Sequence, residues 1–182
     1  MRTALEVFAE HGERGSSLKE IAERVGVSQA GLLHYFGSRE ELFVAVLAER
    51  DTVDSDTVIG TVSTPGEAVA RTAEHNTNTP GLVELFVTLS AASIDPEHPA
   101  HEFFTRRYAD LEATIADGMR QTQAAGDTSL DADPVMLARL LIAISDGIQL
   151  RWLLDPSIDM AAAIEAFNQL CAPRRDNEHL DG

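Results

Sequence analysis

The chain is short of cysteine, of aromatic residues and of long apolar runs. Cys171 is the one cysteine among 182 residues, which excludes an internal disulfide and a thiolate metal cage. The most apolar run, Leu140–Ile144, is far shorter than the ~20 residues of a membrane-spanning helix. The segment Met1–Glu6 lacks the apolar centre of a signal peptide. These absences predict a cytoplasmic protein, and an aromatic content of 5% disfavours a large, promiscuous drug pocket.

Catalytic and metal-binding motifs are missing as well. The sequence has no Gly-x-Ser-x-Gly, no phosphate-binding glycine loop and no zincin motif. His98, His101 and Glu102 lie close together as metal ligands would, but Pro99 and the loop setting favour a solvated turn. We therefore expect no enzyme activity, no cofactor and no metal.

The densest pattern lies in residues 17–42. Its first part predicts a helix that begins with a capping box formed by Ser17 and Glu20. Gly26 ends this helix, because glycine adopts the left-handed backbone that a C-terminal turn needs. One apolar face is spaced at i, i+3, i+4 and i+7, and consists of Leu18, Ile21, Ala22 and Val25.

A second helix of about two turns is predicted at Gln29–Phe36, with Ser28 as its cap. Ser38 and Glu41 form another capping box that opens a further helix. This is the pattern of a helix-turn-helix, whose second helix lies in the major groove of DNA. We assign Val27, Leu32 and Phe36 to the core of the motif.

The run from Val27 to Leu42 resembles the DNA-binding domain of TetR-family transcriptional regulators, and Ala4–Gly12 resembles that family's first helix. Two positions depart from the family pattern: Leu33 stands where Tyr is usual, and Arg39 where Lys is frequent. The resemblance implies an all-helical, dimeric, DNA-binding regulator, most simply a repressor, that a small-molecule inducer releases from a near-palindromic operator.

The predicted DNA contacts follow from the chemistry of the motif. Gln29 carries an amide that can read a base, while Ala30 and Gly31 let the backbone approach the phosphates. The serines could be helix caps only, and Tyr35 could pack against the first helix instead. The predicted DNA-binding set is Ser16, Ser17, Lys19, Ser28, Gln29, Ala30, Gly31, His34, Tyr35 and Arg39.

The overall charge of the chain is unfavourable for DNA binding. The net charge is −16, whereas proteins that bind nucleic acids are usually basic. Residues 1–50 hold six Lys or Arg and eight Glu, and the remainder holds eight basic and twenty-two acidic residues. The acid is therefore concentrated outside the motif. The same numbers also fit a helical dimer that binds a ligand or protein and has lost DNA binding.

Periodicity and Pro or Gly punctuation predict an all-α chain of nine helices without strands. The expected domains are a helix-turn-helix domain at 1–45, a helical ligand-binding and dimerisation domain at 46–175 and a disordered tail at 176–182. Besides the first helix, ending near His11, and the two helices of the motif, we expect helices at 38–57, 64–77, 82–93, 100–125, 134–154 and 159–171.

The last two helices predict a homodimer. The helix at 134–154 is apolar nearly all round, and that at 159–171 has its own apolar stripe, which favours a four-helix bundle across a two-fold axis. Alternatively, both helices form the core of the monomer. The predicted interface residues are Leu141, Ile144, Ile148, Met160, Ile164 and Phe167.

By resemblance, the middle helices surround an inducer cavity, although ordinary core packing would explain the same residues. Only Arg106, Arg107 and Arg151 are basic near these residues, so we expect a neutral or cationic ligand rather than a polyanion. The same arginines could simply pair with acids at the surface. The predicted ligand-binding set is Phe86, Leu89, Ser90, Phe103, Phe104, Tyr108, Gln149 and Trp152.

Overall fold

The computed structural model describes residues 3–7, 9, 18–57, 62–128 and 132–172. Within these ranges the chain is helical and contains no strand, which confirms the all-α prediction. Residues 3–7 and 9 are helical. They are followed by α2 (Leu18–Val25), α3 (Gln29–Phe36), α4 (Arg39–Thr57), α5 (Pro65–Asn76), α6 (Pro80–Ala92), α7 (His101–Ala125), α8 (Pro134–Leu154) and α9 (Met160–Cys171).

The ends of these helices are set by local hydrogen bonds, and the caps at Ser28 and Ser38 were predicted from the sequence. The backbone N–H of Gly31 donates to Ser28 Oγ at 3.0 Å, and that of Glu41 donates to Ser38 Oγ at 3.0 Å. The backbone N–H of Glu67 donates to Thr64 Oγ1 at 3.2 Å. Gly26 ends α2 with φ of +80°, a conformation that a side chain would strain. Ser17, the predicted cap of α2, lies outside the described residues.

Two local predictions are wrong. Helix α6 begins at Pro80 rather than Leu82, because proline fits the first turn of a helix, where its missing N–H is not needed. Val27 was assigned to the core, but its side chain is 44% exposed. The turn after Gly26 is closed by the backbone N–H of Val27, which donates to the carbonyl of Ala22 at 2.9 Å, and it leaves the Val27 side chain at the surface.

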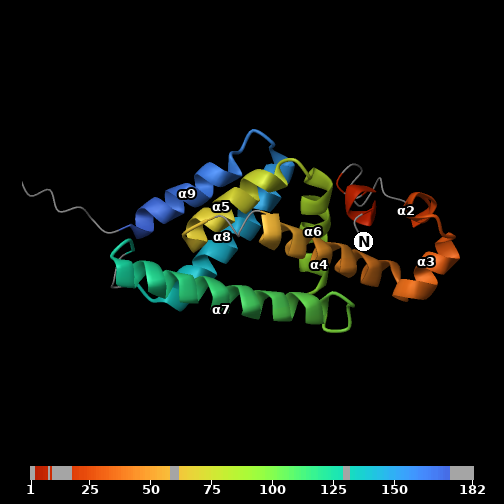
Figure 1. The fold of residues 1–182 in the computed structure, drawn as a ribbon, viewed down its shortest axis with the longest axis horizontal. Helices are drawn as coiled ribbons and strands as arrows, with labels where there is room; N and C mark the ends of the chain where they lie inside the picture. Colours follow the sequence, from red (N-terminus) through yellow and green to blue (C-terminus); the bar gives the residue numbers. More distant parts are fainter. Residues whose placement is uncertain (1–2, 8, 10–17, 58–61, 129–131, 173–182) are drawn as a thin grey trace, which may run out of the picture.

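Figure 1 shows an elongated arrangement with α2 and α3 at one end. Helix α4 runs from that end into the body, where α7 forms one long side and α5, α8 and α9 form the other. Helix α7 packs on α8, and α9 packs on both α5 and α8. Helix α6 lies across the junction and contacts both α4 and α8.

Two clusters of buried apolar residues hold this arrangement together. The first joins the N-terminal helices to α4, α6 and the start of α7 through Leu32, Leu42, Leu47, Leu85 and Phe104. The second joins α5, α7, α8 and α9 and includes Leu141, Trp152 and Ile164. The domain boundary predicted at residues 45 and 46 falls inside α4, in the middle of the first cluster, and it stays a prediction.

Within the described ranges, every helix is too short or too polar to span a bilayer.

The first cluster should contribute strongly to the stability of the chain. Leu85 is completely buried in it, so Leu85→Ala is expected to lower the free energy of unfolding by about 2–5 kcal/mol through lost transfer energy and a cavity. Urea unfolding followed by circular dichroism measures this loss. Ile94→Ala is the control, because Ile94 is 82% exposed and its truncation should change stability by about 0.5 kcal/mol or less. Equal losses in the two variants would contradict the packing described.

Candidate DNA-binding helix and ligand cavity

Helix α3 is anchored on one side and open on the other. Leu32 is 5% exposed and packs in the first cluster with Ile21 and Ala22 of α2. Phe36 is half-buried against the same cluster. These anchors fix the rotation of α3, and so they decide which of its side chains face solvent.

The open side of α3 carries the predicted DNA contacts. Gln29, Ala30, Gly31 and His34 are all exposed, and the Tyr35 side chain is 82% exposed. Tyr35 therefore does not pack against the first helix. Its ring and that of Phe36 pack edge to face, at 4.8 Å between the ring centroids. Six predicted contacts are thus exposed together: Ser28 at the cap of α3, and Gln29, Ala30, Gly31, His34 and Tyr35 within the helix. A helix exposed in this way can enter a groove without rearrangement.

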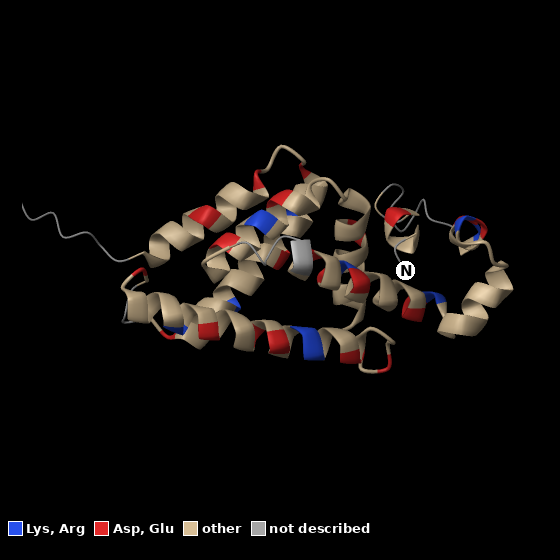
Figure 2. Cartoon of the chain, viewed as in Figure 1, with Lys and Arg blue, Asp and Glu red and all other residues tan. Residues whose placement is uncertain are grey.

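Helix α3 has no charged residue of its own, and Figure 2 shows it free of acid. The neighbouring helix α2 pairs its charges internally: Lys19 Nζ lies 3.8 Å from Glu23 Oε1 and Arg24 Nη2 lies 3.3 Å from Glu20 Oε1. Such exposed pairs are weak and exchange readily for a phosphate. The acidic excess of the chain therefore does not cover the surface that would meet DNA.

The remaining predicted contacts lie at the edges of the motif. Lys19 is exposed on α2, with 74% of its side chain accessible. Arg39 is half-buried at the start of α4, and its guanidinium carbon lies 4.6 Å from the centre of the Phe43 ring. Ser16 and Ser17 lie outside the described residues.

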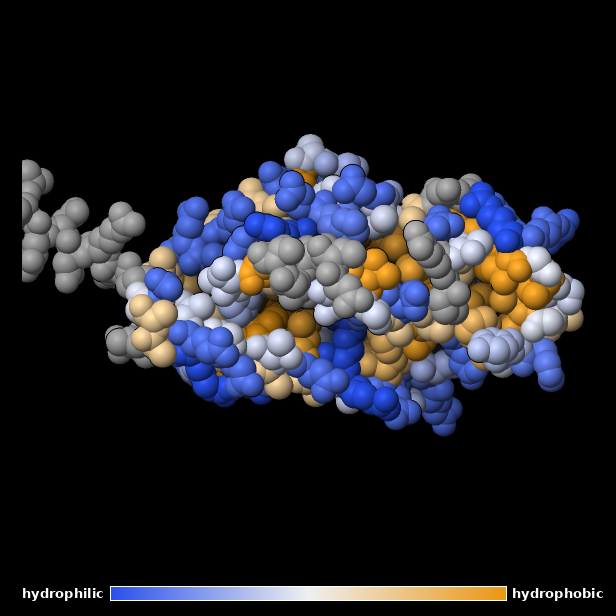
Figure 3. All heavy atoms as spheres, in the orientation of Figure 1, coloured by the Kyte–Doolittle hydropathy of each residue, from blue (hydrophilic) through white to orange (hydrophobic). Residues whose placement is uncertain are grey.

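The second candidate site is a cavity of about 890 Å³ in the body. It is lined by residues of α4, α5, α6, α7 and α8, together with the segment 62–64 before α5. Its volume lies in the range of sites that hold drug-sized ligands, ~300–1,000 Å³. Figure 3 shows apolar atoms in a hollow beside α7, flanked by hydrophilic residues.

The cavity contains only part of the predicted ligand-binding set. Phe86, Phe103 and Gln149 line it. Leu89, Phe104 and Trp152 are buried in the two apolar clusters instead. Ser90 Oγ donates to the carbonyl of Val87 at 3.0 Å, and the Tyr108 hydroxyl donates to Asp146 Oδ2 at 2.6 Å. These five side chains have structural partners and do not line the cavity.

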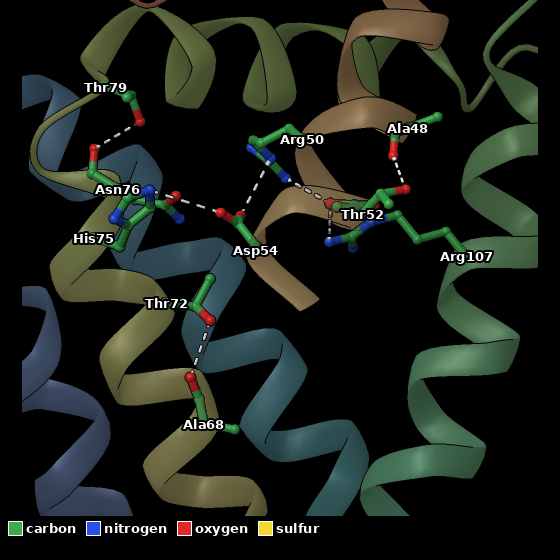
Figure 4. A network of polar contacts seen from close by, with 11 residues as sticks. Ala48, Arg50, Thr52, Asp54, Ala68, Thr72, His75, Asn76, Thr79 and Arg107 are labelled. Atoms are coloured by element: carbon green, nitrogen blue, oxygen red, sulfur yellow. Dashed lines mark hydrogen bonds and ion pairs between the residues drawn. The ribbon is translucent and has the colours of Figure 1, made fainter. Parts of the chain in front are cut away.

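One end of the cavity holds a cluster of charges between α4 and α7 (Figure 4). Arg107 of α7 donates from Nε to Asp51 Oδ2 at 2.6 Å and from Nη2 to Asp51 Oδ1 at 3.2 Å. Arg50 of α4, which is 7% exposed, donates from Nη2 to the same Oδ1 at 3.2 Å. Both guanidinium carbons lie 5.1 Å from the centre of the Phe86 ring. Asp51 therefore bridges two arginines and ties α4 to α7.

The pKa values of the carboxyl groups in this cluster are shifted in opposite directions. Burial acts to raise the pKa of Asp51, but the hydrogen bonds and charge of Arg107, with help from Arg50, outweigh it and hold that pKa below its usual value. Burial raises the pKa of Asp54, and the charges of Arg50 and His75 offset it only in part. Burial likewise raises the pKa of Asp146, against the hydrogen bond from Tyr108.

Sequence reasoning missed most of this cluster. The sequence analysis named Arg106, Arg107 and Arg151 as the basic residues near the cavity. Arg107 is largely buried, whereas Arg106 pairs with Glu102 at the surface and Arg151 is exposed. Arg50 and the three aspartates were not foreseen. One signal was available, because the buried stripe of α4 continues from apolar into polar residues at i, i+4, i+7 and i+11, namely Phe43, Leu47, Arg50 and Asp54.

The predicted interface residues fall into two groups, one buried in the monomer and one at the edge of its core. Leu141, Met160 and Ile164 are at most 1% exposed and belong to the core of the monomer, so they present no side chain to a partner. Ile144, Ile148 and Phe167 are half-buried at the edge of that core. The exposed stripe of α8, spaced alternately by four and three residues, consists of Met136, Leu140, Ala143, Gly147, Leu150 and Leu154.

His98 in the loop before α7 and His101 in the first turn of α7 both make contacts within this segment. His98 Nδ1 accepts from the backbone N–H of Ala100 at 3.1 Å, and His101 Nδ1 lies 2.8 Å from the carbonyl of Ser93. Among the described residues, no cluster of His, Cys, Asp or Glu is arranged to hold a metal ion.

Comparison with known proteins places the N-terminal segment in a family. Residues 1–46 match the profile described as bacterial regulatory proteins, tetR family. The transcriptional regulator RutR of Escherichia coli is 45% identical over 49 residues, which cover 27% of this chain and 23% of RutR. The match thus spans about a quarter of that relative's length. The transcriptional regulator UidR of the same organism is 24% identical over 156 residues, covering 81% of this chain and 76% of UidR.

Solved structures extend the likeness to the whole fold. A transcriptional regulator from Saccharomonospora viridis, solved in complex with choline, is 22% identical to this chain. The two structures superpose with a TM-score of 0.72 over 95% of this chain and 97% of the other. Family members are transcriptional regulators and not enzymes, which agrees with the missing catalytic motifs. The tetR-family match thus covers the helix-turn-helix segment at residues 1–46, and the shared fold extends over nearly the full length of the chain.

Proposed function

We propose that this protein is a ligand-responsive, DNA-binding transcriptional regulator that acts in the cytoplasm. In this proposal residues 1–45 bind DNA, and residues 46–175 bind a small molecule and form the dimer. Repression is the simplest outcome, because it requires only that the dimer occupy a near-palindromic operator. The observation that carries the proposal is α3, whose buried Leu32 turns a row of polar and small residues outward.

The exposed face of α3 has the chemistry of base reading. The Gln29 amide can donate to and accept from an adenine edge, and Ala30 and Gly31 leave room for the backbone near the phosphates. Ser28, His34, Tyr35, Lys19 and Arg39 surround this centre and would bind phosphates. Because phosphate attraction depends on local placement, an acidic body is compatible with DNA binding through α3.

Dimerisation is proposed through α8 and α9, along the exposed stripe of α8. Alternating steps of four and three residues are the spacing at which two helices pack along a common seam. Ala143 and Gly147 lie in the middle of the stripe, and nothing lies within 4 Å of a side chain built on Gly147. Small residues at such a point let two helix backbones approach closely. Each subunit of the dimer would present one α3 to half of the operator.

Helix α4 offers a physical connection between ligand and DNA. Its first turn follows α3 directly, and Arg50, Asp51 and Asp54 in its second half line the cavity. A helix of 19 residues is about 28 Å long and moves as a stiff rod. A ligand that shifts the Arg50 and Asp51 end against α7 would move α3 and change the spacing of the two α3 helices in the dimer.

The alternative is a helical dimer that binds a ligand or a protein and has lost DNA binding. The net charge of −16 favours it, whereas the uncharged and exposed surface of α3 favours the regulator. A mobility-shift assay on DNA selected from random duplexes by the protein separates the two, because the alternative predicts no selected sequence.

The assignment of Gln29 to base reading has a specific consequence. Gln29→Ala should reduce the preference for the selected operator over scrambled DNA by about 1–3 kcal/mol, while binding to scrambled DNA stays unchanged. Fluorescence anisotropy on both duplexes measures this ratio. Gln169→Ala on α9 is the matched control, because Gln169 is an exposed glutamine outside the motif. An unchanged ratio in Gln29→Ala would show that another residue reads the bases.

Lys19 should behave differently from Gln29. Lys19→Ala is expected to weaken binding to both duplexes alike and to lower the salt dependence of log K by about one phosphate contact. The measurement is anisotropy over a series of salt concentrations. A loss confined to the operator duplex would instead make Lys19 a base contact.

The proposed dimer can be tested without disturbing the monomer. Gly147→Glu adds a side chain into open space, so the fold should be retained, but it places two like charges against each other at the seam. We expect monomers by light scattering and operator binding weakened by about tenfold or more. Gly147→Ala is the control, because it keeps a small residue there and should raise helix stability by about 1 kcal/mol. A Gly147→Glu protein that remains fully dimeric would rule out this stripe.

The bridge between α4 and α7 predicts a dependence on acid. The pKa of Asp51 is lowered in the folded protein, so its ionised form stabilises the fold above about pH 3.8, its usual pKa, and this contribution is lost as the pH falls through the lower folded pKa. Asp51→Asn should flatten the loss of stability below about pH 4, measured by urea unfolding at several pH values. Asp127→Asn, at an exposed position, should keep the wild-type slope. A wild-type slope in Asp51→Asn would refute the bridge.

A further inference from the structure

The cavity presents hydrogen-bonding atoms that the protein leaves without a partner. Nε and Nη1 of Arg50 are buried and make no hydrogen bond among the described residues; Asp54 Oδ2 lies 3.9 Å from Nε, which is too far for a hydrogen bond. Gln149 Oε1 and Asn76 Oδ1 are buried acceptors without a donor. Arg50, Asn76 and Gln149 are each at most 7% exposed, and all three line the same cavity. Donors and acceptors without hydrogen-bond partners are therefore both present around one cavity.

Such groups are costly unless something fills the cavity. A buried donor or acceptor without a partner costs about 1–3 kcal/mol, and native proteins keep few of them. Gln149 illustrates the asymmetry, because its Nε2 donates to the carbonyl of Ser145 at 3.1 Å while its Oε1 receives nothing. Three such side chains from α4, α5 and α8 converge on one cavity, which indicates a site built for a molecule that supplies the missing partners.

The charge of the cluster restricts that molecule. Arg50 and Arg107 face three carboxyls, those of Asp51, Asp54 and Asp146, so the cluster offers no excess of positive charge to an anion. The Arg50 charge is already balanced by Asp51 at 3.2 Å and Asp54 at 3.9 Å. A cationic group beside the open Nε and Nη1 of Arg50 would be repelled. A neutral oxygen satisfies those donors without disturbing the balance.

An apolar part of the lining lies on α5, α7 and α8. The body of the ligand would meet Ala68 and Val69 of α5, Leu111 and Ile115 of α7, and Ile142 of α8. These side chains make no hydrogen bonds, so they favour a hydrocarbon or aromatic body over a sugar or a nucleotide.

We propose that the cavity binds an uncharged small molecule with an apolar body and a polar head. The head carries a carbonyl or hydroxyl oxygen that accepts from Arg50 and an O–H or N–H group that donates to Gln149. This deepens the proposed function, because it names the chemical class of the molecule that controls DNA binding. Arg50 belongs to α4, so the residue that receives the ligand lies on the helix that also leads to α3.

A series of three compounds with the same body tests the head group. The probes are 3-phenylpropanamide, 3-phenylpropanoate and 3-phenylpropylammonium, each titrated by isothermal calorimetry and by thermal shift in the absence of DNA. The amide alone offers both an acceptor and a donor without charge. We expect it to bind at least about tenfold more tightly than either charged analogue and to raise the melting temperature with concentration.

Variants assign the binding to the named atoms. Gln149→Leu removes the acceptor and should weaken amide binding about threefold to tenfold, the value of one neutral hydrogen bond. Arg50→Gln should weaken it about tenfold or more, because the bond from a charged donor is stronger. Gln169→Leu on α9 is the matched control and should bind as the wild type does. Without ligand, the Gln149→Leu protein should melt no lower than the wild type, because the substitution removes a buried acceptor that has no partner. If the Gln149→Leu protein does not fold, Gln149→Met is used in its place.

The outcomes are separable from those of the proposed function. The inference is overturned if 3-phenylpropanoate or 3-phenylpropylammonium binds best, if the amide does not bind at millimolar concentration, or if Gln149→Leu and Arg50→Gln leave amide binding unchanged. Because these measurements use no DNA, amide binding by a protein that selects no operator would support the cavity and defeat the regulator. Operator binding without amide binding would do the reverse.

Discussion

Burial of the apolar face of α4 is the interaction on which the rest of the molecule depends. Leu42, Phe43, Val46 and Leu47 are almost completely buried, and they pack both against the N-terminal helices and against α6 and α7. No separate hinge or linker lies between the two regions, because a single helix enters a single cluster. A displacement of α4 therefore costs packing on both sides at once. This makes α4 a stiff element that either moves as a unit or does not move.

The polar end of α4 is costly in the free protein and useful for binding. Arg50 and Asp54 occupy positions that continue the buried stripe, and they are placed beside Asp51 and Arg107 rather than in solvent. Burial of this cluster removes hydration from four charged groups, and the ion pairs within it restore only part of the lost energy. A core of leucines would fill the same space more cheaply. The cluster is therefore better explained by recognition of a ligand than by stability.

The acidic character of the chain finds its explanation in where the charges lie. Helix α3 carries none, the charges of α2 are paired with one another, and the excess of acid belongs to the body. A repulsive body and an uncharged reading helix would together suppress binding to arbitrary DNA more than binding to a matched operator. Such a distribution of charge should give a small electrostatic, salt-dependent contribution to DNA affinity and a high selectivity for the operator over other sequences.

The sequence by itself determined the helices and the motif. Ser28, Ser38, Thr64 and Gly26 act within one turn of their own position, so their hydrogen bonds and backbone angles could be predicted from local chemistry. The exposure of Gln29 was expected in the same way, whereas the sequence left open whether Tyr35 packs against the first helix, and the structure leaves it 82% exposed. Val27 escaped this reasoning, because its exposure depends on the path of the turn rather than on its own hydrophobicity.

Only the tertiary structure decided which residues line the cavity and which face a partner. The sequence suggested ligand contacts at Trp152, Phe104 and Leu89, but these side chains are buried in the apolar clusters. It gave no sign that Arg50, Asp51 and Asp146 are other than solvated charges, but the packing of α4, α7 and α8 brings them together at the cavity. Likewise Leu141 and Leu140 are neighbours of equal hydrophobicity, and one is in the core while the other is 44% exposed. The physical reason is that a periodic pattern fixes which residues share a helix face. The rotation and the neighbours of that face are set by contacts between residues tens of positions apart, which no local pattern encodes.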